Sequence, residues 1–241
     1  MRGVAIVPCR AGSKGIPSKN RMEFHGMPLF MWSVAAAIED DRIRSVCITT
    51  DDEEIIGWCN WASTRDKKIA CVVRPAEMAA DDSPTEPGLF HACNELGVMK
   101  HEFVVLLQPT SPIRHNGLLS RCIGEAERTG SSFSCSLPGH IAWLKTGGNA
   151  VPLYNPRRRP RRQDLDGHPQ VVMEDGSVYC SIYDQMCISG TRFGERPVSV
   201  DSEFIHGVQI DTLEEAKILR HLCADEAVKS WMEKVQLLLP K

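Results

Sequence analysis

Basic side chains and glycines are concentrated directly after the first apolar run of the chain. The segment Pro8–Asn20 reads PCRAGSKGIPSKN. Its three cations and two glycines are Arg10, Lys14, Lys19, Gly12 and Gly15. Glycines allow a tight turn that presents backbone N–H groups to an anion, and like charges this close repel one another unless an anion neutralises them. The segment therefore predicts a loop that binds a triphosphate; the alternative is a solvated basic loop.

This loop lacks the two best-known nucleotide signatures. Neither GxxxxGK[ST] nor GxGxxG occurs in it. Their absence disfavours P-loop ATPases and dinucleotide-dependent dehydrogenases.

The bulk composition is typical of a globular protein and narrows the function classes. The formal net charge is −3, which disfavours a general nucleic-acid binder. No apolar run approaches the ~20 residues that cross a bilayer, and the first nine residues lead into a polar loop rather than forming a signal peptide. The ten cysteines include no C-x-x-C pair, so we expect buried reduced thiols and a cytoplasmic location.

Short β-branched runs alternate with amphipathic segments of helical length over the first 140 residues. The expected strands span residues 4–8, 45–50, 69–73 and 103–107, and later 176–181 and 208–210. The expected helices span residues 29–40, 52–62, 87–96 and 116–129, and later 213–238 with a break near 224–225. Thr212 and Glu215 fit a capping box at the start of the last helix. This order predicts a three-layer α/β/α sandwich with a mainly parallel, Rossmann-like sheet, forming one domain over residues 1–241.

The alternation is interrupted by residues 139–170, which are rich in Gly, Pro and Arg. We expect them to form an inserted arm. An isolated two-stranded excursion is marginal in water, and the apolar residues at 141–143 and 151–154 need another surface to cover them. A second subunit supplies one symmetrically, so the arm predicts a homodimer.

Five collinear segments of the chain resemble the acylneuraminate cytidylyltransferases, the CMP-sialic acid synthetases. The loop resembles the family's RxGSKGxxxKN. Residues 45–55, which end in TTDDEEI, resemble the family's second strand and the turn that follows it. RPAEMA at 74–79, LQPTSPIR at 107–114, and RRQDL at 161–165 followed by DGSVY at 175–179 are similar to the family's RPAELA, LQPTSPLR and RRQDL…NGAIY. The resemblance spans nearly the whole chain, in the family's order.

The resemblance implies nucleotidyl transfer. The anomeric hydroxyl of an acidic 2-keto sugar of the sialic acid (nonulosonate) type would attack the α-phosphate of CTP, and pyrophosphate would leave. Arg10 and Lys19 would act as catalytic residues on the triphosphate, with Asp211 as the third. The nucleotide-binding residues would be Ala11, Gly12, Ser13, Lys14, Gly15, Asn20, Arg74 and Thr85. The last three fall where the family reads the base; the alternatives are a surface arginine for Arg74 and a helix cap for Thr85.

The acceptor sugar would contact three further residues. Gln108 follows the fourth strand, where ligands of open α/β sheets bind, and its amide suits sugar hydroxyls or an acyl amide. Arg162 and Tyr179 match acceptor-side positions, and a guanidinium can bind the sugar's carboxylate bidentately. The alternatives are a turn residue for Gln108 and a solvated basic arm for the run that contains Arg162.

The expected metal position departs from the family pattern. Where the family has IDIDT, this chain has VQIDT, so Asp211 is retained and Gln209 replaces the first aspartate. We expect Asp211 to carry Mg²⁺ (or Mn²⁺) and Gln209 to be a weak ligand, because an amide oxygen binds a hard cation less well than a carboxylate. Residues two apart on a strand would share one face. The eight histidines suggest no site, and only His206, near Asp211, is of interest.

Other functions stay open at this point. The nearest is a CMP-Kdo-type synthetase, which uses an eight-carbon acceptor, and another is a nonulosonate enzyme that uses a guanylyl donor. A catalytically inactive homologue would be supported by Gln209 alone. A nucleic-acid binder would rest on the arginine run at 157–162 in an otherwise acidic chain.

Overall fold

A seven-stranded sheet forms the centre of the computed structural model, which describes residues 1–12, 15–80, 83–136, 142–159, 161 and 171–241. Its strands are β1 (Gly3–Cys9), β4 (Ile43–Thr50), β5 (Ile69–Val73), β6 (Phe103–Leu106), β7 (Ser131–Ser136), β10 (Met173–Ile182) and β11 (Val198–Asp201). They lie in the order β11-β7-β10-β6-β1-β4-β5. All neighbours in this order are parallel except β10, which runs antiparallel to both β6 and β7. The mainly parallel sheet is confirmed.

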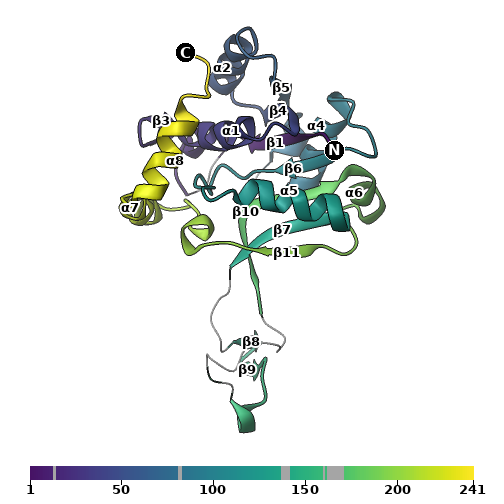
Figure 1. Ribbon diagram of the computed structural model, residues 1–241, viewed down its shortest axis with the longest axis vertical. Helices are drawn as coiled ribbons and strands as arrows, with labels where there is room; N and C mark the ends of the chain where they lie inside the picture. The colour runs from purple at the N-terminus through teal and green to yellow at the C-terminus, as the bar shows by residue number, and fades with distance from the viewer. Residues whose placement is uncertain (13–14, 81–82, 137–141, 160, 162–170) are drawn as a thin grey trace.

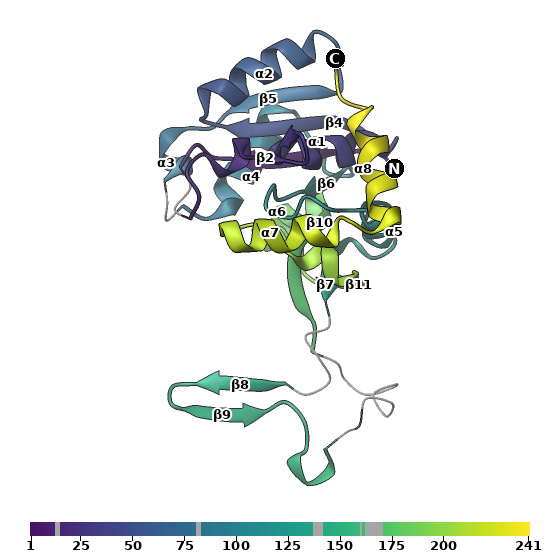
Figure 2. The same ribbon diagram turned by 90° about the vertical axis from the view of Figure 1, so that its left-hand side faces the viewer.

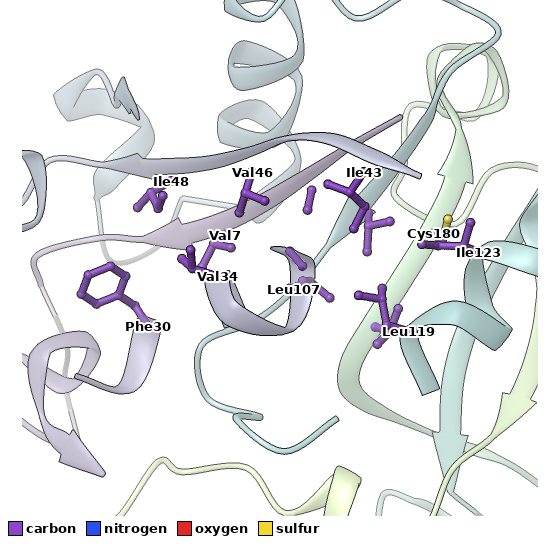
Figure 3. Close-up of a cluster of buried hydrophobic side chains, with 14 of the residues drawn as sticks. Val7, Phe30, Val34, Ile43, Val46, Ile48, Leu107, Leu119, Ile123 and Cys180 are labelled. Atoms are coloured by element: carbon purple, nitrogen blue, oxygen red, sulfur yellow. The ribbon is translucent and has the colours of Figure 1, made fainter. Parts of the chain in front are cut away.

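Helices cover both faces of this sheet (Figures 1 and 2). The helices are α1 (Leu29–Glu39), α2 (Glu53–Ser63), α3 (Ala76–Ala79), α4 (Thr85–Glu95), α5 (Leu118–Thr129), α6 (Tyr183–Ser189), α7 (Leu213–Leu222) and α8 (Glu226–Gln236). α1, α2 and α5 pack on one face, where Phe30, Val34 and Ile123 meet strand residues such as Val7, Val46 and Ile48 (Figure 3). α4 and α6 pack on the other face. The three-layer arrangement is therefore confirmed, because these five helices bury apolar side chains against the two faces of the sheet.

The two C-terminal helices form a further layer on the outer side of α1. Trp231 of α8 lies 6.2 Å from Trp32 of α1, measured between ring centroids, in a second apolar cluster that also contains Ile16 and Ile210. α7 begins at the expected capping box: Thr212 Oγ1 accepts from the Glu215 N–H, and the Glu215 carboxylate accepts from the Thr212 N–H. The helical region is interrupted between α7 and α8, close to the expected position.

Several elements differ from the sequence expectation. Residues 208–210 are not a strand; they follow the short 3-10 helix η4 (Phe204–Gly207) as irregular backbone. β7, β11 and α6 were not expected. β7 reads SSFSCS, so a hydrophobicity pattern does not reveal it as a buried strand. Its serines can be buried because their hydroxyls form internal hydrogen bonds. Ser132 Oγ donates to the Cys122 carbonyl, and Ser134 Oγ donates to Asp175.

The described part of the arm forms its own small sheet. β8 (Trp143–Thr146) pairs antiparallel with β9 (Asn149–Pro152), and the 3-10 helix η2 (Pro156–Arg158) follows. The hairpin extends away from the main body of the molecule (Figure 2). Trp143, Leu144, Val151 and Leu153 are each about half exposed in the single chain. Among the described residues, no helix is both long and apolar enough to cross a membrane.

Candidate functional site

The site lies where the sheet reverses its winding direction. β1 pairs with β4 on one side and with β6 on the other, and all three strands are parallel. Their carboxyl ends therefore lie on one edge of the sheet, which is where open α/β sheets bind ligands. The loop after β1 carries Arg10, the loop after β4 begins at Asp51, and Gln108 follows β6 by two residues.

Backbone hydrogen bonds hold the start of the glycine loop in place. The Ala11 N–H donates to Asp51 Oδ1 over 2.7 Å, and Asn20 Nδ2 donates to the Arg10 carbonyl over 2.9 Å. Arg10 Nη1 reaches across to the Ala80 carbonyl at 3.3 Å. Asn20, which the resemblance puts at the base, is buried and uses its amide N–H₂ to shape the loop. Gly12 is exposed, and the expected ligands Ser13 and Lys14 lie outside the described residues.

Two residues from opposite ends of the chain meet at this loop. Lys19 Nζ lies 2.6 Å from Asp211 Oδ1, and the side chains are 15% and 58% exposed, respectively. A Cβ at Gly15 would lie 2.4 Å from the Asp211 carbonyl oxygen, so only glycine permits this approach of the loop to Asp211. The structure thus brings the expected phosphate-binding lysine and the expected metal-binding aspartate into direct contact.

Arg74 is a buried cation behind this site. It follows β5, is 8% exposed, and its guanidinium donates to Oγ1 and the carbonyl of Thr49. Burial lowers the pKa of Arg74 from its usual value, and the nearby carboxylate of Asp51 opposes that shift. Its guanidinium packs over Gly88 of α4, where a Cβ would lie 3.3 Å from Nε. The interpretation of Arg74 as a surface arginine is therefore wrong.

Thr85 lies close to Arg74 along α4. It is the first residue of that helix and half-buried, and Pro84 occupies the N-cap position. The helix-cap alternative for Thr85 is not supported by this geometry.

Gln108 is held in place through its own backbone. Its carbonyl accepts hydrogen bonds from Arg114 Nη2 at 2.7 Å and from Ser33 Oγ at 3.3 Å. Arg114 is 2% exposed and also donates to the Ser177 carbonyl of β10. Burial lowers the pKa of Arg114 to about 9, and the nearby Asp175 carboxylate opposes this shift. Arg114 was part of the matching LQPTSPIR segment, but the sequence did not indicate that it supports Gln108.

Gln209 lies beside Gln108 above a glycine of β10. A Cβ at Gly176, whose φ is +74°, would lie 2.4 Å from Gln209 Nε2 and 2.9 Å from Gln108 Oε1. Gln209 Nε2 donates to the Asp175 carbonyl at 3.1 Å, and Thr110 Oγ1 lies 3.5 Å from Gln209 Oε1. Both ends of this amide are therefore used in protein contacts. Because the segment is not a strand, the expectation that Gln209 and Asp211 share a strand face is wrong.

Tyr179 lies in β10 and is almost fully buried. Its hydroxyl donates to Glu174 Oε2 at 2.8 Å, and burial together with this bond raises its pKa above the usual range. The ring packs edge-on against Phe193, and the Arg192 guanidinium lies 5.2 Å from its centroid. Arg162, which was also expected to contact the acceptor sugar, lies outside the described residues.

The donor set suits a cation that takes most of its ligands from a substrate. Within the described residues, no group of three or more His, Cys, Asp or Glu side chains could hold a metal ion. Asp211 offers one exposed carboxylate next to the phosphate loop. Mg²⁺ typically binds through one or two carboxylates plus substrate phosphates and water, so this chemistry fits Mg²⁺ together with a triphosphate.

Comparison with known proteins identifies the family. Residues 4–135, more than half of the chain, match the family model described as Cytidylyltransferase. The chain belongs to the cytidylyltransferase family. The matched segment contains the glycine loop, Arg74, Thr85 and Gln108, and ends before the arm and Asp211.

Two curated relatives of this chain carry a more specific name than the family model. The chain is similar to the N-acylneuraminate cytidylyltransferase of Oncorhynchus mykiss, at 32% identity over 183 residues, which are 73% of this chain and 40% of the relative. It is also similar to the enzyme of that name from Streptococcus agalactiae serotype III, at 25% identity over 248 residues, 98% of this chain and 57% of the relative. The chain thus spans about half the length of these relatives.

The solved structures support the fold of this family member. A CMP:2-keto-3-deoxy-manno-octonic acid synthetase complexed with CTP superposes with a TM-score of 0.66 at 14% identity, covering 93% of this chain and 99% of the other. A 4-diphosphocytidyl-2C-methyl-D-erythritol synthase gives a TM-score of 0.63 at 10% identity, with the same coverage.

The anchored amide of Gln209 leads to a stability prediction. Gln209→Glu replaces the N–H₂ that donates to the Asp175 carbonyl with an oxygen, so a carboxylate faces an acceptor. We expect the free energy of unfolding to fall by about 1–3 kcal/mol, the typical effect of leaving buried polar groups unpaired. Urea unfolding at pH 7 measures it. Gln236→Glu is the matched control, because Gln236 Nε2 donates to the His25 carbonyl at an exposed position. Equal losses in the two variants would contradict the anchoring role.

Proposed function

We propose that this protein transfers CMP from CTP to the anomeric hydroxyl of an acidic 2-keto sugar of the sialic acid type and releases pyrophosphate. The observation that carries the proposal is the contact between Lys19 of the glycine loop and Asp211 of the late segment, beside Gln108 at the switch point of the sheet. The relatives named N-acylneuraminate cytidylyltransferase support the choice of donor and acceptor.

In the proposed reaction the acceptor hydroxyl oxygen forms a bond to the α-phosphorus. The bond from that phosphorus to the oxygen bridging to the β-phosphate breaks, pyrophosphate leaves, and the hydroxyl proton passes to solvent. Negative charge grows on the phosphate oxygens during this step, and fixed cations that face them lower the barrier. Arg10 and Lys19 supply those cations, and the exposed backbone at Gly12 and Gly15 lets phosphate approach closely. Arg74, Thr85 and Asn20 form the side of the loop assigned to the base.

Mg²⁺, or Mn²⁺, is the proposed cofactor, with Asp211 as its protein ligand. When bound, it would neutralise phosphate charge. Lys19 already neutralises Asp211 in the free protein, so binding of a metal would release the lysine toward the phosphates. Gln209 contributes little to this site, because its amide oxygen lies near Thr110 Oγ1 and its nitrogen donates to Asp175.

The identity of the acceptor sugar is the more specific part of the proposal. Gln108 places a neutral amide above Gly176, beside the Gln209 amide that Asp175 and Thr110 hold, which suits hydroxyl and acyl-amide groups of a nine-carbon sugar acid. A second candidate is the eight-carbon acid, because a synthetase named for that acid shares the fold. A guanylyl donor is the remaining alternative.

A homodimer in a reducing, cytoplasmic compartment is the proposed setting. The exposed apolar side chains of β8 and β9 need a covering surface, which a second copy would supply reciprocally. Nine of the ten cysteines are buried or half-buried, and all ten are free thiols. Eight of the nine are fully buried in the single chain.

The direct test of function is a pyrophosphate-release screen. Each of the four nucleoside triphosphates is combined with N-acetylneuraminate or 3-deoxy-manno-octulosonate, in Mg²⁺ and again after chelation. We expect release with CTP and N-acetylneuraminate only, and only with the metal. Release with GTP or with the octulosonate would select the corresponding alternative, and release in chelator would remove the metal from the proposal.

Removal of the loop cation should affect turnover more than folding. We expect Lys19→Ala to lower kcat by at least about tenfold, because roughly 1.4 kcal/mol of lost transition-state stabilisation suffices. Lys67→Ala is the matched control, since Lys67 is exposed on the turn before β5. Near-normal kcat in a folded Lys19→Ala protein would refute the assignment of the loop.

Subunit mixing tests whether the arm completes the neighbouring site. We expect Arg162→Ala and Lys19→Ala homodimers each to be weakly active. If a site combines Lys19 of one chain with Arg162 of the other, exchange should restore one intact site per mixed dimer. The measurement is activity after subunit exchange, which is verified by mass spectrometry. A monomer by light scattering, or an exchanged mixture no more active than its parents, would exclude the shared site.

A further inference from the structure

Two histidines are buried against each other beside the acceptor side of the site. His115 is 2% exposed and His206 is fully buried. His206 Nε2 lies 2.9 Å from His115 Nδ1, and the ring centroids are 4.7 Å apart. Both ends of this pair meet Glu203: its backbone N–H lies 3.0 Å from His206 Nδ1, and its Oε2 lies 3.3 Å from His115 Nε2. The contacts form a closed ring.

The ring of contacts fixes where each proton resides. A backbone N–H can only donate, so His206 Nδ1 must be an unprotonated acceptor. Neutral His206 then carries its proton on Nε2 and donates it to His115 Nδ1. Neutral His115 therefore carries its proton on Nε2, facing the Glu203 carboxylate. A proton added to either Nδ1 would set two donors against each other and break one link.

These links lie along a seam between two segments that carry site residues. One segment is the loop after β6, which begins at Gln108 and runs to Asn116. The other starts at Glu203 and ends at Asp211. Further contacts continue the seam: the Ile210 N–H donates to the Thr110 carbonyl at 2.8 Å, and Asn116 Nδ2 donates to Glu203 Oε1 at 2.5 Å. The histidine pair thus fixes one end of the segment whose other end is Asp211.

We propose that His115 and His206 are positioning residues for the acceptor half of the site, holding the segment that ends in Asp211 against the loop that begins at Gln108 while both rings are neutral. This inference rests on the proposed function, because it assigns Gln108 to the acceptor. Neither histidine contacts the described part of the glycine loop, and Asp211 lies at the far end of the held segment, so the proposal gives the pair a larger effect on acceptor binding than on CTP binding.

The surroundings of His206 favour its neutral form. Burial and then His115 lower the pKa of His206 to about 4, while the carboxylates of Glu203 and Asp175 oppose this shift and Arg121 adds to it. The unfolded chain binds a proton at this histidine below about pH 6.5, and the folded protein does not until about pH 4. Stability therefore falls as the pH is lowered through that window. His206→Gln should show a smaller loss of stability between pH 7 and pH 5 than the wild type.

The closing experiment compares two substitutions of His115. One removes the hydrogen-bond acceptor for His206, and the other keeps an acceptor there. His115→Phe keeps the ring and removes the acceptor for His206. His115→Asn keeps an acceptor, because its Oδ1 lies near the position of Nδ1. His101→Phe, at an exposed turn, is the control. The KM for CTP, the KM for N-acetylneuraminate and kcat are measured for each, and ¹⁵N spectra of the wild type report the histidine tautomers.

We expect His115→Phe to raise the acceptor KM about tenfold and leave the CTP KM within about twofold, with His115→Asn restoring most of the loss. Equal changes in both KM values, no change in either, or failure of His115→Asn to recover would overturn the positioning role while the proposed function stands. A proton on Nδ1 of either ring in the spectra would also overturn it. A wild type inactive with every acceptor and nucleotide would instead refute the proposed function, and the role of the pair with it.

Discussion

The contact between Lys19 and Asp211 is the constraint on which the rest of the site depends. The two residues are 192 positions apart, yet their charged atoms lie 2.6 Å from each other. Apolar neighbours make this approach possible: Ile16 and Ile210 are both buried in the cluster between α1 and the C-terminal helices. Gly15 contributes by lacking a Cβ where the Asp211 carbonyl passes. Folding of the last 30 residues onto α1 is therefore what completes a phosphate site begun by the first strand.

Two buried arginines support this arrangement from inside the sheet edge. Removing a guanidinium from water is costly unless its donors are satisfied, and the pKa values of Arg74 and Arg114 are both lowered by burial. Their bonds go to the ends of strands or the loops beyond: Arg74 to Thr49, and Arg114 to Gln108 and Ser177. These bonds hold the Thr49 carbonyl of β4, the Gln108 carbonyl beyond β6 and the Ser177 carbonyl in the irregular part of β10, so the residues at the sheet edge do not depend on loop sequence alone. Preorganisation of this kind lowers the reorganisation needed on binding.

Much of this fold could be predicted from the sequence, because buried parallel strands such as Phe103–Leu106 are continuous apolar runs bounded by turns. β7 could not be predicted, since its serines can be buried only once their hydroxyls are hydrogen-bonded to Asp175 and the Cys122 carbonyl. The motifs indicated Lys19 and Asp211, which the structure brings into contact, as well as Arg74 and Gln108, whose roles stay predictions. They did not indicate that Arg114 holds the Gln108 carbonyl or that His115 pairs with His206, because a supporting residue is recognised only by the carbonyl or ring that it contacts in the folded chain.

The replacement of the family aspartate by Gln209 follows from the residue behind it. Asp175 is a buried carboxylate whose Oδ1 accepts from Ser134 Oγ and the Ser177 N–H, while its Oδ2 has no hydrogen-bond partner. A second carboxylate at position 209, next to the Asp175 carbonyl, would add like charge where the dielectric constant is low. An amide instead donates to that carbonyl and leaves Arg114 as a positive charge near Asp175. The same substitution leaves Asp211 as the one acidic side chain of the VQIDT segment, so a cation bound there must complete its coordination from phosphate and water. Under the proposed function, charge is met at Lys19 and Asp211, whereas Gln209 is held against Asp175 and leaves Gln108 as the amide that meets the acceptor.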